Sequence, residues 1–128
     1  MAKAKIMIID DEEDFLRLTK MNLEDTGKFE VMTLANAKDI IPRLHNFKPD
    51  LILLDLLMPG IGGIDVCEIL NKDLAEQSVP VIVLSALDKN SDKLKAYQEG
   101  VVDYLVKPIE KEALIASIDK ALQSKYGQ

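Results

Sequence analysis

The chain has 128 residues, of which 48% are hydrophobic and 30% are charged, a balance typical of one globular domain and not of a disordered segment. The formal net charge of −6 argues against direct nucleic-acid binding, which needs a basic surface to neutralise phosphates. No apolar run approaches the roughly 20 residues of a membrane span, and the N-terminal segment lacks the pattern of a signal peptide. A single cysteine and a single histidine exclude an internal disulfide and Cys- or His-rich metal sites, and we expect a reducing, cytoplasmic setting.

Five short apolar segments alternate with five amphipathic segments of helical length. The expected strands cover residues 5–9, 31–34, 51–54, 79–84 and 104–106. The expected helices cover residues 13–25, 37–47, 63–74, 88–98 and 111–125. This alternation predicts an α/β fold in which helices cover both faces of a parallel sheet. Because the last expected helix reaches the end of the sequence, we expect a single domain over residues 1–128.

The composition of the strands predicts their order. Three of them, at 5–9, 51–54 and 79–84, are continuous Ile, Leu and Val runs, as in strands covered on both faces. The strand at 31–34 contains a threonine and the one at 104–106 is short, so both suit sheet edges. These assignments fit the doubly wound, flavodoxin-like order 2-1-3-4-5, in which sites form outside the carboxyl ends of the strands, near the switch between strands 1 and 3.

Acidic residues follow two of the central strands. Asp10 and Asp11 end the first strand, and Asp55 is embedded in the apolar run of the third. Like charges about 4 Å apart repel by roughly 1–4 kcal/mol, so such a cluster needs a cation or shifted pKa values. Carboxylate oxygens favour a hard divalent ion such as Mg²⁺. Glu13 is interpreted as an acid in the first turn of the following helix, where the helix dipole stabilises its negative charge. Glu12 fits either this role or a role in the acidic cluster.

Polar residues also end the fourth and fifth strands. Ser85 ends the fourth, and Asp88 is the better candidate for capping the helix that follows. Lys107 ends the fifth and precedes Pro108. In the expected fold Lys107 emerges at the same edge as the acids, where its ammonium group could balance them or bind an anion.

Taken together, these motifs resemble the receiver domain of two-component response regulators, the group that includes the chemotaxis response regulator. The resemblance spans essentially the whole chain. It rests on Asp10-Asp11, LILLDLLMPG at 51–60, Gly63, Ser85-Ala86 and DYLVKP at 103–108. Each motif alone is weak, but all occur in order, and most of them follow the end of an expected strand.

The resemblance implies a phosphorylation site. Asp55 is then the nucleophile that accepts a phosphoryl group and becomes an aspartyl phosphate. Asp10, Asp11, Asp55 and the backbone carbonyl of Leu57 are the implied Mg²⁺ ligands. Lys107 is expected to pair with the phosphoryl group, and the backbone amide after Asp55 to donate to it.

The resemblance also implies a conformational switch. The Ser85 hydroxyl is expected to bond the phosphoryl group, and Tyr104 to rotate inward as Ser85 moves. The surface expected to change covers 88–98 and 104–122, the fourth helix, fifth strand and fifth helix. Pro108 is expected to follow a cis peptide bond.

The implied partners are a histidine kinase or histidine phosphotransfer protein and a downstream protein target. We expect a stand-alone receiver domain without an output domain, with no direct nucleic-acid contact and no membrane insertion. Such a protein catalyses only its own phosphorylation and dephosphorylation, so it is not an enzyme with a separate substrate.

Several positions receive a distinct interpretation. Leu57 and Leu87, two residues after Asp55 and Ser85, cannot position water, so we expect slow loss of the phosphoryl group. Phe15 is interpreted as a packing residue, and Gly62-Gly63 as a flexible turn without a chemical role.

Two other functions compete with this one. Asp10 and Glu12 could mimic the nucleophile and acid–base pair of haloacid-dehalogenase-like phosphatases, but the sequence departs from their Asp-x-Asp pattern and Asp55 is left unexplained. A flavodoxin-like binding module has the same strand order. In this chain, however, the acids that follow the first expected strand would repel a flavin phosphate.

Overall fold

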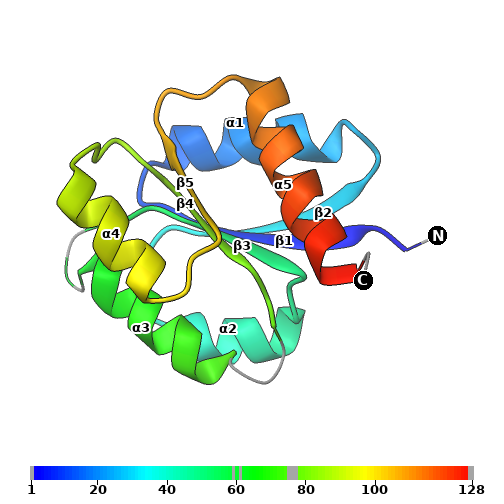
Figure 1. Cartoon of the computed structure of the whole chain (residues 1–128). Helices are drawn as coiled ribbons and strands as arrows, with labels where there is room; N and C mark the ends of the chain where they lie inside the picture. The colour runs from blue at the N-terminus through cyan, green and yellow to red at the C-terminus, as the bar shows by residue number, and fades with distance from the viewer. Residues whose placement is uncertain (1, 59, 61, 75–77, 127–128) are drawn as a thin grey trace.

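A computed structural model describes residues 2–58, 60, 62–74 and 78–126 as a five-stranded parallel sheet with helices on both faces (Figure 1). The strands are β1 (Ala4–Ile9), β2 (Phe29–Leu34), β3 (Leu51–Leu54), β4 (Val81–Ser85) and β5 (Asp103–Val106). The helices are α1 (Glu13–Glu24), α2 (Ile40–Phe47), α3 (Gly63–Asp73), α4 (Asn90–Gln98) and α5 (Lys111–Tyr126). The strand order is β2-β1-β3-β4-β5, which confirms the predicted topology.

The alternation of side chains along each strand divides the core into two layers. Ile6 and Ile8 of β1 face α1 and α5, whereas Met7 and Ile9 face α2, α3 and α4. The central strands are apolar on both faces because each face is covered by helices. All four residues of β3 are buried, as are all five of β4. The two edge strands, β2 and β5, are the ones predicted from their composition.

The starts of α2 and α4 differ from the predicted ones. Helix α2 begins at Ile40 and not at 37, and α4 begins at Asn90 and not at 88. The assignment of Asp88 as the cap of α4 was wrong, because Lys89 occupies the N-cap position and no side chain caps the helix. Asp88 instead forms an ion pair with Lys93, 2.8 Å away and one turn into the helix.

The turn between α4 and β5 contains a glycine in a conformation that other residues rarely adopt. Gly100 has a φ of +92°, a conformation that glycine adopts without steric penalty, and it separates α4 from β5. None of the helices in the described ranges is long and apolar enough to cross a membrane.

Candidate functional site

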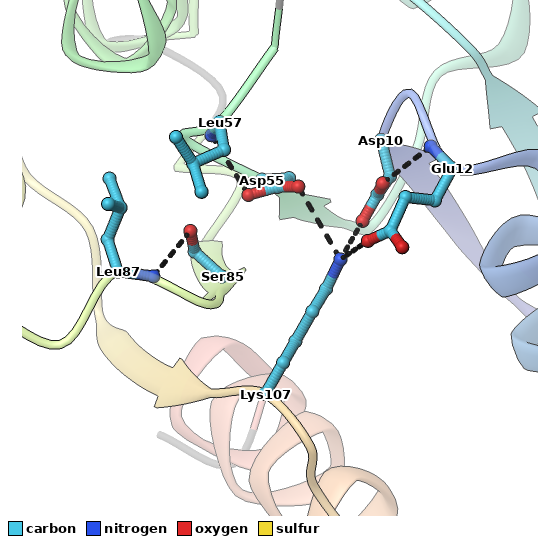
Figure 2. A network of polar contacts seen from close by, with 7 residues as sticks. All are labelled: Asp10, Glu12, Asp55, Leu57, Ser85, Leu87 and Lys107. Atoms are coloured by element: carbon cyan, nitrogen blue, oxygen red, sulfur yellow. Dashed lines mark hydrogen bonds and ion pairs between the residues drawn. The ribbon is translucent and has the colours of Figure 1, made fainter.

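The carboxyl ends of β1, β3, β4 and β5 meet at one edge of the sheet. Because all neighbouring strands are parallel, the residue that ends each strand projects toward the same region. Asp10 follows β1, Asp55 follows β3, Ser85 ends β4 and Lys107 follows β5. Figure 2 shows these four side chains around a common centre.

Three carboxylates form a compact cluster at this centre. One oxygen each from Asp10, Asp11 and Asp55 lies within 4.8 Å of the other two. Asp10 is 1% exposed and Asp55 is 4% exposed, whereas Asp11 faces solvent. Burial raises the pKa of Asp10 above its ordinary value, although hydrogen bonds from Lys107 and the Glu12 amide oppose the shift. Because burial disfavours the ionised form of this carboxyl group, a nearby cation would stabilise it.

Backbone amides fix the orientation of both buried carboxylates. The Glu12 amide donates to Asp10 Oδ1 at 2.9 Å, and the Leu57 amide donates to Asp55 Oδ1 at 3.0 Å. Each bond spans two residues, so each aspartate closes a local turn directly after its strand. The remaining oxygen, Oδ2, of each aspartate points toward the centre of the site (Figure 2).

Lys107 supplies the positive charge of the cluster. Its Nζ lies 2.6 Å from Asp10 Oδ2, 2.9 Å from Glu12 Oε1 and 3.4 Å from Asp55 Oδ2. Burial alone would lower the pKa of Lys107, but the hydrogen bonds to Asp10 and Glu12, together with the negative charges of Asp55 and Asp10, outweigh it and raise the pKa above its usual value. The Lys107–Pro108 peptide bond is cis, as the resemblance implied.

Two contacts of Lys107 go beyond the roles predicted for Glu12 and Phe15. Glu12, which fitted either a helix-dipole or a site role, forms an ion pair with Nζ. Phe15, interpreted as a packing residue, has its ring centroid 4.1 Å from Nζ, a cation–π distance. Phe15 lies three residues after Glu12, one turn further along the chain, so helical spacing was the available signal for both.

Ser85 and Tyr104 meet at the backbone of Leu87. Ser85 is fully buried, and its Oγ accepts a hydrogen bond from the Leu87 amide at 3.3 Å. The Tyr104 hydroxyl donates to the Leu87 carbonyl oxygen at 2.8 Å. Tyr104 is 8% exposed, so its side chain lies almost entirely away from solvent. Burial, and after it the negative charge of Asp92, raises the pKa of Tyr104 to about 12.

The donor set fits a divalent cation. Three clustered carboxylates are hard oxygen ligands of the kind that Mg²⁺ prefers. Glu12 brings the number of carboxylates at this edge to four, against the one ammonium group of Lys107 that pairs with three of them, so negative charge is in excess among these described residues. The Leu57 amide contacts Asp55, while the role of its carbonyl as a ligand stays a prediction. Pro59, part of the motif at 51–60, lies outside the described residues.

Comparison with known proteins identifies the class to which this fold and site belong. A family model for the response regulator receiver domain matches residues 6–119. The chain therefore belongs to the receiver domain family of two-component response regulators, whose members are signalling switches. Membership in this family sets aside the haloacid-dehalogenase-like and flavodoxin-like alternatives.

Individual relatives agree with this assignment. The chain is 35% identical over 120 residues to protein PilH of Pseudomonas aeruginosa, covering 93% of this chain and 98% of PilH. It is 34% identical over 121 residues to the alkaline phosphatase synthesis transcriptional regulatory protein PhoP of Bacillus subtilis. That match covers 93% of this chain but 48% of PhoP, so the chain spans about half the length of that relative.

A solved structure of a two-component response regulator from Clostridium difficile superposes with a TM-score of 0.88 at 27% identity. That match covers 97% of this chain and 99% of the other. The fold predicted from the alternating strands and helices is therefore the fold of the family.

Proposed function

We propose that this receiver domain is switched by transfer of a phosphoryl group to Asp55. An oxygen of the Asp55 carboxylate attacks phosphorus, the bond from phosphorus to the donor's leaving group breaks, and an aspartyl phosphate forms. The observation that carries the proposal is the buried position of Asp55 within reach of two other carboxylates and the Lys107 ammonium group.

We propose that Asp10, Asp11, Asp55 and the Leu57 carbonyl hold Mg²⁺. When bound, the ion offsets the repulsion between the attacking carboxylate and the negatively charged phosphoryl oxygens. The burial of Asp10 and its raised pKa support this assignment, because a cation stabilises the ionised carboxylate.

The polar groups around Asp55 have complementary roles in this proposal. The Lys107 ammonium group would pair with one phosphoryl oxygen, and the backbone amide after Asp55, that of Leu56, would donate to another. The Ser85 hydroxyl would bond a third. Asp55 is then both the nucleophile and the group that these donors surround.

The shared contacts at Leu87 support a route from the site to the surface. If Ser85 turns toward a phosphoryl oxygen, its bond to the Leu87 amide weakens and the segment before α4 can move. Tyr104 holds the Leu87 carbonyl, so it responds to the same movement. The phosphoryl group would thereby favour one of two arrangements of α4, β5 and α5, a population shift that a downstream protein reads.

The proposal extends to partners and setting. We propose a histidine kinase or histidine phosphotransfer protein as the phosphodonor and a protein as the target, without direct nucleic-acid contact or membrane insertion. We also propose a single receiver domain over 1–128 that acts in the cytoplasm. PilH, of which this chain covers 98%, is a relative of comparable length.

Incubation with a small phosphodonor such as acetyl phosphate tests this function. Intact-mass analysis should show one added phosphoryl group in the presence of Mg²⁺ and far less when the metal is chelated. Asp55→Ala should abolish the addition, whereas Asp65→Ala, which removes an exposed carboxylate from the first turn of α3, should not. Phosphorylation that survives in Asp55→Ala would contradict the proposal.

A further inference from the structure

The ammonium group of Lys107 has a full set of acceptors. It carries three N–H donors, and three carboxylates lie at 2.6 Å (Asp10), 2.9 Å (Glu12) and 3.4 Å (Asp55) from Nζ. The Phe15 ring adds a cation–π contact with its centroid 4.1 Å away. A phosphoryl oxygen can therefore bond to Lys107 only by replacing one of these contacts.

The acceptors lie on two sides of the ammonium group. Figure 2 shows Asp10 and Glu12 together on one side and Asp55 on the other. A phosphoryl group on Asp55 adds its oxygens on the Asp55 side. An ammonium group that follows these oxygens therefore moves away from Asp10 and Glu12.

Burial decides which of these two contacts is released more easily. Asp10 is almost fully buried, so removing its cation would leave an uncompensated charge inside the protein. The Glu12 side chain is 63% exposed, so water can replace its ammonium partner. Glu12 is therefore the contact that exchanges.

We propose that Glu12 and Phe15 form a resting position for the Lys107 ammonium group that competes with the phosphoryl group on Asp55. This inference rests on the proposed function, because it takes Asp55 as the phosphoacceptor. Glu12 is here a positioning residue, which acts through Lys107 and does not touch the phosphoryl group. Loss of the Glu12 contact should favour the phosphorylated arrangement.

Beryllium fluoride, a phosphoryl analogue that binds carboxylates, provides the test. Its affinity is measured at saturating Mg²⁺ for the wild type, Glu12→Gln and Glu12→Asp. The aspartate keeps the charge but is one methylene shorter. It also stands at the N-cap of α1, which no side chain caps, so its carboxylate would favour the helix amides over Lys107. Glu13→Gln is the matched control, since Glu13 is exposed and makes no ion pair among the described residues.

Both Glu12 variants should bind the analogue about two- to fivefold more tightly than the wild type, the range expected for loss of an exposed ion pair. Glu13→Gln should match the wild type. If only Glu12→Gln binds the analogue more tightly, removal of the negative charge at position 12 explains the tighter binding and loss of the contact with Lys107 does not. The inference then fails. Unchanged or weaker binding in both Glu12 variants would also overturn it. A wild type that binds no analogue would contradict the proposed function itself, and this inference with it.

Discussion

Gly63 packs directly against the backbone of Leu56. A Cβ atom at Gly63 would overlap the Leu56 Cα and would lie 2.5 Å from its carbonyl oxygen and 2.7 Å from its Cβ. Leu56 lies between Asp55 and Leu57 in the sequence, and the Leu57 amide donates a hydrogen bond to the Asp55 side chain. The first residue of α3 therefore determines how closely the helix approaches the candidate phosphorylation site. The interpretation of Gly62-Gly63 as a turn without a role was incomplete for Gly63.

Gly63→Ala should disturb the site through this contact. We expect a loss of about 1–3 kcal/mol in the free energy of unfolding, as for other overpacked positions. A displaced Asp55 should also slow phosphorylation by roughly tenfold or more, because small misplacements of reacting groups have large effects on rate. Denaturant unfolding and the rate with acetyl phosphate, measured on the folded variant, check both effects.

Gly62→Ala is the matched control for this variant. The added Cβ would lie 3.2 Å from Asp65 Oδ2, the end of a flexible side chain, and Gly62 has an ordinary φ of −67°. We expect a change in stability within about 0.5 kcal/mol. Equal phosphorylation rates in the two variants would show that the contact with Leu56 does not position Asp55.

The leucines two residues after Asp55 and Ser85 should prolong the phosphorylated state. Leu57 is 48% exposed and Leu87 is partly buried, and neither side chain can bond to water. Leu57→Asn and Leu87→Glu should each shorten the lifetime. One hydrogen bond to an attacking water is worth about 1 kcal/mol, or roughly fivefold in rate.

The decay of the phosphorylated protein after removal of the phosphodonor measures these lifetimes. The backbone contacts of both leucines are retained in the variants, since they involve the amides and not the side chains. Leu57→Met, which keeps an apolar side chain, should decay like the wild type. A wild-type lifetime equal to or shorter than those of the polar variants would reject the explanation.

Because of Tyr104, the folded protein should lose stability at alkaline pH. Its pKa is about 12 in the folded protein, above the ordinary value of 10.0, because burial and nearby acids disfavour the phenolate. The unfolded chain therefore loses this proton first as the pH rises. The stability that depends on neutral Tyr104 is fully present below pH 10 and is lost between pH 10 and 12.

Denaturant unfolding at several alkaline pH values measures this effect. Tyr104→Phe should be less stable than the wild type near neutral pH, because it lacks the bond to the Leu87 carbonyl. It should then lose less stability than the wild type between pH 10 and 12. Tyr97→Phe, which alters an exposed tyrosine, should follow the wild type. Parallel curves for Tyr104→Phe and the wild type would contradict the assignment.

The sequence was sufficient for the topology and for the convergence of the acids. The apolar runs of β1, β3 and β4 identify buried strands, and parallel pairing brings Asp10 and Asp55 to one edge without further information. Family resemblance added the expected roles, and the family match now supports the class.

Contacts that depend on three-dimensional packing were not predictable in the same way. The closeness of Gly63 to Leu56 depends on how α3 packs against the loop after β3. The bond from the Tyr104 hydroxyl to the Leu87 carbonyl joins segments 17 residues apart, and it meets the local bond from the Leu87 amide to Ser85 at the same residue. The start of α4 at Asn90 depends on the backbone at Lys89, which has no favourable capping side chain to indicate it.

Localisation of the phosphoryl group to one carboxylate tests the central claim most directly. The protein is phosphorylated with acetyl phosphate and Mg²⁺, and the acyl phosphate is reduced with borohydride, which converts a phosphorylated aspartate to homoserine. Tandem mass spectrometry then identifies the modified residue. The account predicts homoserine at position 55 with positions 10 and 11 unmodified. Modification at Asp10 with Asp55 intact would contradict it.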